Sequence, residues 1–205
     1  MPDSTRWTDQ DVPLDELPTG SVNTDSLVIL DNMRSQFSAA DSIIEGRPVS
    51  FYLNRADVSQ TAKDFYSLRF IPSGNDATFA LCDSILSSND TTRPFYYFLF
   101  TRMMRIADGG LAEGMSDYAV KYILQYPKEF YKRLKEPLYK ELYNNWVEFA
   151  ASTLMLPGIK NPTADEVRSY IIKEQTKKIK GLTASLRNEM EAFADTVAKM
   201  QEKNR

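Results

Sequence analysis

Apolar side chains recur at every third or fourth residue along most of this 205-residue chain, which is the spacing of one face of an α-helix. Proline, glycine and short polar clusters interrupt this pattern, as they do between helices. The β-prone stretch 49–53 is too short to make a sheet alone and is expected to be an extended connector, with a small hairpin as the alternative. The chain is therefore predicted to be all-α, a helical bundle or irregular α-helical array of six to eight helices with a long C-terminal helix.

Residues 1–25 differ from the rest of the chain in charge. They carry six acidic residues and one arginine, a net charge of −5, so that residues 26–205 are +2 when the whole chain is −3. The acidic side chains repel one another, and three prolines and one glycine break regular structure, so residues 1–25 are expected to form a flexible acidic leader. The alternative is a short motif that docks on the body or on a partner. We expect residues 26–160 to form a helical body, and residues 161–205 a long C-terminal helix packed on that body or on a partner.

Local signals predict where several helices begin and end. A first helix is expected from about residue 26 to Glu45, where Gly46 follows. Asp57 and Gln60 resemble a capping box that opens a second helix, which is expected to reach about residue 71. The stretch 94–106 has almost no polar face and is predicted to be the central helix.

The second half of the chain carries similar signals. Asp108-Gly109-Gly110 is expected to end the central helix, and Ser116 to open the next. Pro127 and Pro137 each mark a helix boundary. Thr163 and Glu166 form a clear capping box, after which the chain is predicted to continue as one long helix or two collinear ones.

The C-terminal segment contains a nearly heptad-spaced apolar seam. Its residues are separated by steps of 3, 4, 4, 3, 4 and 3, and they are Ile179, Leu182, Leu186, Met190, Phe193, Val197 and Met200. Five of them are candidate partner-binding residues, namely Leu182, Leu186, Met190, Phe193 and Val197. The alternative is that the seam packs on its own bundle.

The chain carries few residues that perform chemistry. It has no histidine, which removes the common catalytic triads and the commonest zinc ligand. Its single cysteine, Cys82, lies in an apolar run and is expected to be a reduced core residue. Asp108, Glu113 and Asp117 could hold a hard cation, but capping and solvation explain them better. We expect no catalytic residue, no metal and no cofactor.

Aromatic residues make up 12% of the chain, and the tyrosines cluster between Tyr96 and Tyr143. Rings with a polar tip suit either a core or a recognition pocket. The candidate ligand-binding residues are Tyr96, Tyr97, Tyr118, Tyr122 and Tyr126. A basic stretch near residues 128–140 has interleaved aromatics, and its lysines are expected to face water. The triplet Asn89-Asp90-Thr91 fits the glycosylation acceptor pattern.

These observations rank the functional hypotheses. A non-enzymatic binding or scaffold protein acting through helical surfaces, with a protein partner or self-association, comes first. A helical domain with a Tyr/Phe pocket for a small molecule or peptide is the alternative, and a carboxylate-dependent enzyme ranks lower. Nucleic acid is not expected, because the pI is about 5.2.

A soluble protein without a transmembrane segment is expected, because no apolar run is long enough to span a bilayer. The compartment stays open. Met1 suits a native start of a cytoplasmic protein, and equally a start that replaces the removed signal of an exported or lipid-tethered protein.

Overall fold

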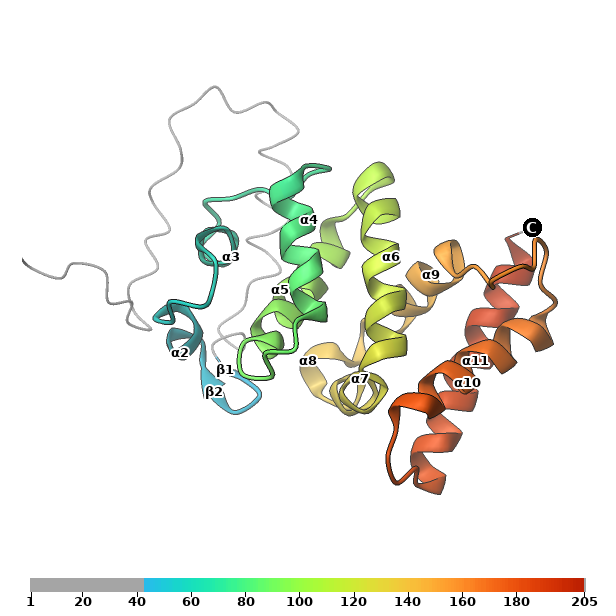
Figure 1. Cartoon of the computed structure of the whole chain (residues 1–205). Coiled ribbons are helices and arrows are strands. Elements are labelled where there is room, and N and C mark those ends of the chain that lie inside the picture. The colour runs from blue at the N-terminus through green and yellow to red at the C-terminus, as the bar shows by residue number, and fades with distance from the viewer. Residues whose placement is uncertain (1–42, 205) are drawn as a thin grey trace, which may run out of the picture. The chain divides into compact units, whose positions relative to one another are not determined.

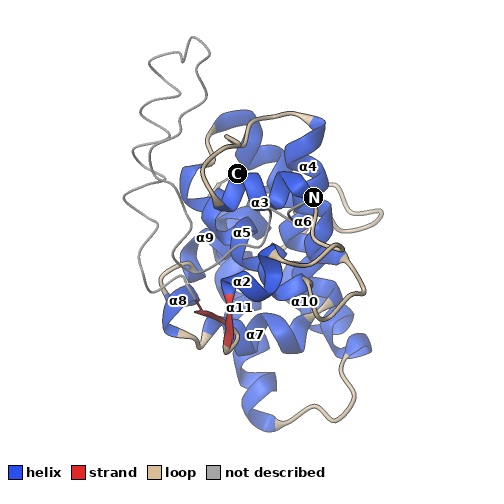
Figure 2. Cartoon of the chain, turned by 90° about the vertical axis from the view of Figure 1, so that its left-hand side faces the viewer, coloured by secondary structure: helices blue, strands red, loops and turns tan. Residues whose placement is uncertain are grey.

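The computed structural model describes residues 43–204, and residues 1–42 and 205 lie outside the described part. Within residues 43–204, eight α-helices have seven residues or more, and the only sheet is a two-stranded hairpin (Figure 2). The predicted all-α class is therefore confirmed. The acidic leader and nearly all of the first predicted helix fall outside the described residues.

The chain divides into two compact units, Met1–Ala107 and Asp108–Arg205. The boundary between the two units falls where one helix ends at Ile106 and the next begins at Gly109.

No helix among residues 43–204 combines the length and the apolar character that a membrane crossing requires.

The described part of the first unit opens with a tight hairpin. β1 (Ile43–Ile44) pairs antiparallel with β2 (Arg47–Pro48). Between them, Glu45 and Gly46 have φ values of 47° and 75°, a left-handed backbone that a right-handed helix does not contain. The prediction that the first helix continues to Glu45 is therefore wrong.

A short helix, α2 (Val49–Leu53), follows the hairpin directly, so the predicted extended connector is also wrong. Val49, Tyr52 and Leu53 are all buried, and their spacing of three and four places them on one side of a helix. Tyr52 stacks on Phe95 with ring centroids 5.3 Å apart. Tertiary packing here outweighs the β propensity of the local sequence.

The predicted second helix corresponds to α3 (Gln60–Tyr66), which is capped by Ser59 and not by Asp57. The Ser59 hydroxyl accepts a hydrogen bond from the Ala62 N–H at 3.2 Å. The helix ends earlier than predicted, because Leu68 has a φ of 61°. Next come α4 (Asp76–Asp83), whose N-cap is Asn75, and the 3₁₀ turn η2 (Ser84–Leu86).

The prediction of a central helix at 94–106 is confirmed by α5 (Arg93–Ile106), in which every residue from Arg93 to Met104 is buried. Pro94 lies in the first turn, where a missing N–H costs no hydrogen bond. The rings of Phe95 and Phe98 stack along the helix with centroids 6.4 Å apart. α5 is thus the centre of the apolar core of the first unit.

The second unit begins with α6 (Gly109–Gln125), α7 (Pro127–Leu134), α8 (Pro137–Lys140) and α9 (Tyr143–Thr153). Pro127 and Pro137 open helices as predicted. The central helix ends before Asp108-Gly109-Gly110 as predicted, but the expected start of the next helix at Ser116 is wrong, because Gly109 and Gly110 form the first turn of α6. Ser116 consequently lies inside α6, and its hydroxyl donates to the Ala112 carbonyl at 2.8 Å.

Two antiparallel helices complete the second unit, in place of the predicted single or collinear helix. α10 (Ala164–Lys178) begins at the predicted capping box, in which the Thr163 N–H donates to Glu166 Oε2 at 2.7 Å. Gly181, with a φ of 69°, lies in the turn that reverses the chain. The longest described helix, α11 (Ala184–Lys203), then packs beside α10 (Figure 1).

Replacing Phe98 or Leu99 by alanine should destabilise the first unit by about 2–5 kcal/mol, because each side chain is fully buried and its loss leaves a cavity. Urea unfolding followed by circular dichroism measures the change. The exposed Arg105, on the same helix, is the control, and Arg105→Ala should cost less than about 0.5 kcal/mol. Equal effects of all three substitutions would contradict the central position of α5.

Candidate functional site

The structure divides the five candidate ligand-binding tyrosines between the two units. Tyr96 and Tyr97 lie on α5 in the first unit. Both are buried, and the Tyr96 hydroxyl accepts a hydrogen bond from the Ser59 N–H at 2.9 Å. Both rings therefore belong to the core of the first unit, and the Tyr96 hydroxyl also holds the N-cap residue of α3 in place.

The other three tyrosines, Tyr118, Tyr122 and Tyr126, lie on α6 in the second unit. Tyr122 is fully buried, and its ring lies 5.9 Å from the ring of Trp146. The buried Arg133 guanidinium donates a hydrogen bond to the Tyr122 hydroxyl. Tyr122 is thus a core residue, and the structure does not bring the five tyrosines together into one pocket.

The apolar seam of the C-terminal segment is buried in only part of its length. Met190, Phe193 and Val197 are fully buried within their own unit, whereas Leu182 and Leu186 are half-buried. The ring of Phe193 packs edge-on against those of Phe130, Tyr131 and Tyr143, with centroids 5.1, 6.1 and 5.9 Å apart. The C-terminal half of the seam therefore packs on its own helices, and Leu182 and Leu186 are the candidates left for a partner.

Aspartate substitutions should separate the two halves of the seam. Phe193→Asp should unfold the second unit, because a carboxylate cannot be buried among apolar rings without a large penalty. Leu186→Asp should leave the unit folded, since its side chain is already half-exposed. Thermal melts followed by circular dichroism test both variants. A folded Phe193→Asp protein would overturn the assignment of this residue to the core.

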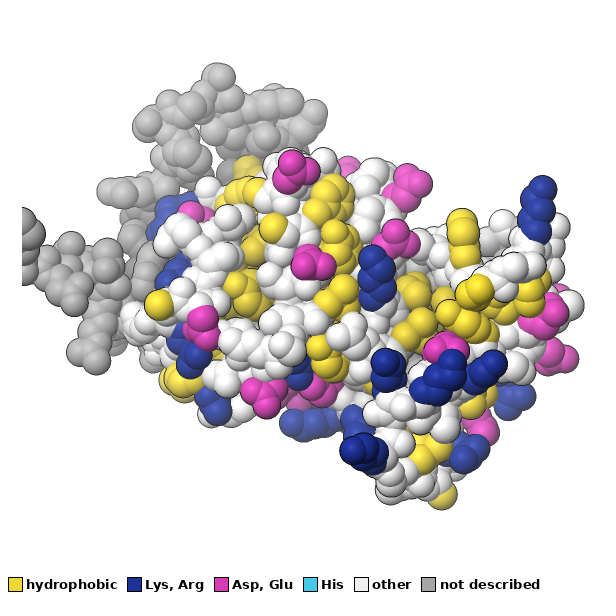
Figure 3. All heavy atoms as spheres, viewed as in Figure 1, with side chains coloured by type: hydrophobic (Ala, Val, Ile, Leu, Met, Phe, Trp, Pro, Cys, Tyr) yellow, Lys and Arg dark blue, Asp and Glu magenta, His cyan; other side chains and the backbone are white. Residues whose placement is uncertain are grey.

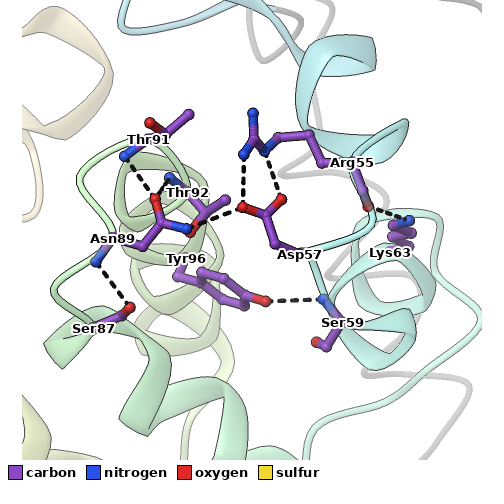
Figure 4. Close-up of polar contacts among 9 residues, drawn as sticks. All are labelled: Arg55, Asp57, Ser59, Lys63, Ser87, Asn89, Thr91, Thr92 and Tyr96. Atoms are coloured by element: carbon purple, nitrogen blue, oxygen red, sulfur yellow. Dashed lines mark hydrogen bonds and ion pairs between the residues drawn. The ribbon is translucent and has the colours of Figure 1, made fainter.

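A polar cluster joins two loops of the first unit (Figure 4). The Arg55 guanidinium donates two hydrogen bonds to the Asp57 carboxylate, at 2.6 and 2.7 Å, and this pairing lowers the pKa of Asp57 to about 2. The Asn89 side-chain amide donates to the same carboxylate at 3.0 Å. Asp57 therefore fixes the loop before α3 against the loop before α5.

The side-chain oxygen of Asn89, Oδ1, also makes hydrogen bonds. It accepts from the backbone N–H groups of Thr91 and Thr92 at 3.1 and 3.3 Å. Both ends of the side-chain amide thus make structural hydrogen bonds. Glycan attachment would replace one of the two hydrogens on the Asn89 nitrogen that donates to Asp57, so the observed contacts give this side chain a loop-fixing role.

Reactive side chains are sparse in the described part of the chain. Residues 43–204 contain no group of three or more Cys, Asp or Glu residues that could hold a metal ion. Cys82 is fully buried, and burial raises the pKa of its thiol to about 12. A thiol of this kind stays protonated near neutral pH and is a poor nucleophile.

Cys82 should resist dithionitrobenzoate in the folded protein, because both burial and its raised pKa suppress the thiolate. In urea the same protein should release one equivalent of thionitrobenzoate, matching its single cysteine. Rapid labelling without denaturant would show that Cys82 is accessible.

A candidate site within the described residues is a cavity of about 650 Å³ in the second unit. It lies where the loop after α9 passes the C-terminal end of α11, and that region of the surface is rich in hydrophobic side chains (Figure 3). Apolar lining residues include Leu154, Met155, Leu156 and Ile159. A volume between about 300 and 1,000 Å³ is typical of ligand sites.

Two exposed hydrophobic side chains belong to this cavity. Met155 is 84% exposed and Ile159 is 40% exposed, and Ile43 of the first unit, at 59%, is the third large hydrophobic side chain exposed among residues 43–204. Single exposed hydrophobics are ordinary, but adjacent ones on the rim of a cavity are typical of binding sites.

The exposure of Met155 follows from the way α9 ends. Leu154 has extended backbone angles, φ −60° and ψ 110°, and successive side chains of an extended segment point to opposite sides. Leu154 and Leu156 are buried, and Met155 between them must therefore point outward. Its exposure is built into the backbone of this segment.

The loop that carries the cavity is held at three places. The Gln201 side-chain amide of α11 donates to the Leu154 carbonyl at 2.8 Å. Leu156 and Ile159 form an isolated β-bridge across a turn with Gly158 at a φ of 77°, where glycine is favoured. The capping box at Thr163 fixes the far end of the loop. The cavity is therefore largely preformed.

The polar groups of the cavity complement an uncharged or anionic ligand. Among residues 43–204, no carboxylate side chain lines it, and the one ionic lining residue is the exposed Lys160. Ser152, Gln201 and Asn204 supply neutral polar groups. Gln201 Oε1 is buried and accepts no hydrogen bond within the described residues, which leaves one unmet acceptor in the cavity wall.

No protein-family model, curated protein or solved structure matches this chain. The cavity does not follow from the sequence pattern, because Pro157-Gly158 indicates only the end of a helix. The available signal was Met155 and Ile159 flanking that turn, two large apolar residues where a surface turn ordinarily has polar ones.

Proposed function

We propose that the protein is a non-enzymatic binding module, and that its second unit binds an apolar segment of a partner protein at the cavity after α9. The observation that carries the proposal is the pairing of Met155 and Ile159, both exposed, on the rim of one preformed cavity. Burying such side chains against a partner stabilises a complex by about 1.5–3 kcal/mol each.

The position of Met155 favours a protein partner over a small molecule. At 84% exposure, this side chain stands largely outside the cavity that it lines. A small ligand inside the cavity would leave most of Met155 in water, whereas a partner surface would fill the cavity and cover the rim together. Methionine adapts its shape to varied apolar partners, which suits a recognition surface.

The five tyrosines do not support the aromatic-pocket alternative, because they are divided between two units and Tyr97 and Tyr122 are fully buried. The half-buried Leu182 and Leu186 of the apolar seam belong to a different surface from the cavity.

Binding can be tested with peptides selected from a random phage-displayed library against the full chain. Affinities of selected peptides are then measured by fluorescence polarisation for the wild type, Met155→Asp and Ile159→Asp. Each substitution should weaken binding about tenfold or more, because it places a charge where an apolar contact is lost.

The matched control is Ile43→Asp, which makes the same kind of change at an exposed hydrophobic side chain of the first unit. It should leave peptide affinity unchanged, and circular dichroism should show all three variants folded. Failure to select any peptide, or equal binding by Met155→Asp and Ile43→Asp, would refute the proposal.

A further inference from the structure

The turn between α10 and α11 gathers positive charge. Residues 173–187 contain five basic residues and one acidic residue, a net charge of +4. All five basic side chains are exposed, and they are Lys173, Lys177, Lys178, Lys180 and Arg187. Figure 3 shows dark blue side chains crowded over this end of the α10–α11 pair.

Most of this charge is not neutralised by residues 43–204. Lys177 pairs with Glu174 at 2.6 Å. Lys178, Lys180 and Arg187 form no salt bridge with any residue between 43 and 204, and the same holds for Lys173. The other four cations of the turn therefore have no ionic partner within the described part of the chain.

The turn is held in place by α7. The Lys128 ammonium group donates a hydrogen bond to the Lys180 carbonyl oxygen, which adds another exposed cation beside the turn. Farther along α7, Lys135 is paired with Glu189 at 2.8 Å. Unpaired charge is thus concentrated toward the turn.

Apolar side chains lie among these cations. Ile179, Leu182 and Leu186 are each half-buried, in contrast to the fully buried Met190 farther along α11. Neither the cavity after α9 nor a smaller one of about 210 Å³ beside Tyr143 is lined by these residues. A projecting turn of lysines with apolar side chains between them suits a flat, anionic surface better than an inserted peptide.

We propose that the α10–α11 turn binds the surface of an anionic lipid bilayer. The lysine ammonium groups contact lipid phosphates, and Ile179 and Leu182 lie against the boundary between headgroups and acyl chains. This inference is independent of the cavity after α9, and either proposal can fail without the other. Each lysine near such a surface contributes about 1 kcal/mol, which is roughly fivefold in affinity.

The test is co-sedimentation of the full chain with vesicles of phosphatidylcholine alone, and with vesicles that also contain phosphatidylglycerol. The wild type should bind only the anionic vesicles, and added salt should weaken binding because it screens exposed charges. Lys178→Glu combined with Lys180→Glu should reduce binding by about 25-fold or more, since two attractions are lost and two repulsions added.

The control is Lys199→Glu combined with Lys203→Glu, which makes the same charge change near the other end of α11. It should retain most of the binding. Equal losses from both double variants would show attraction by net charge only, and equal sedimentation with neutral vesicles would remove the electrostatic basis. Tighter binding to soluble polyglutamate than to anionic vesicles would assign the turn to an acidic protein segment. Each of these results, like a complete lack of vesicle binding, overturns the proposal.

Discussion

The packing of Phe193 against three aromatic rings is the interaction on which the second unit depends. Phe193 meets Phe130 edge-on at 5.1 Å, and Phe130 in turn meets Trp146 at 5.2 Å, so that α7, α9 and α11 share one aromatic core. Such pairs add stability beyond the burial of their area. Because this contact fixes the position of α11, it also fixes the features at the two ends of that helix. These are Gln201 of the cavity near the C-terminal end, and the turn from α10 before the N-terminal end.

Polar contacts then hold the segments that the apolar core leaves free. In the first unit, Asp57 and Asn89 join two loops, and in the second, Gln201 holds the carbonyl of Leu154. Between α10 and α11, Arg168 pairs with Asp195 at 2.6 Å. An exposed ion pair of this kind contributes little stability, so these contacts set position more than they add free energy.

The sequence predicted the features that depend on neighbouring residues. The burial of α5 and the capping box at Thr163 followed from local patterns, because helix periodicity and caps are short-range. Asp57 is a residue whose role local patterns do not predict. Serine caps a helix as well as aspartate does, so Ser59 caps α3, and Asp57 instead accepts a hydrogen bond from Asn89, 32 residues away. The exposure of Met155 was unpredictable for a related reason, since it depends on the backbone angles of Leu154 at the end of α9. The reversal of the chain at Gly181 depends on the packing of α10 against α11. Apolar periodicity is the same for two antiparallel helices and for one continuous helix, so it could not predict this turn.

The length of α11 sets a distance between the two proposed sites. Its 20 residues span about 30 Å at 1.5 Å per residue, with the basic turn before Ala184 and the cavity residue Gln201 near the other end. A helix packed along its length is a stiff rod, so this separation is a constant of the molecule. If the turn binds a bilayer with α11 along the membrane normal, the length of this helix places the cavity beyond the lipid headgroups, where a partner can reach it without touching the membrane.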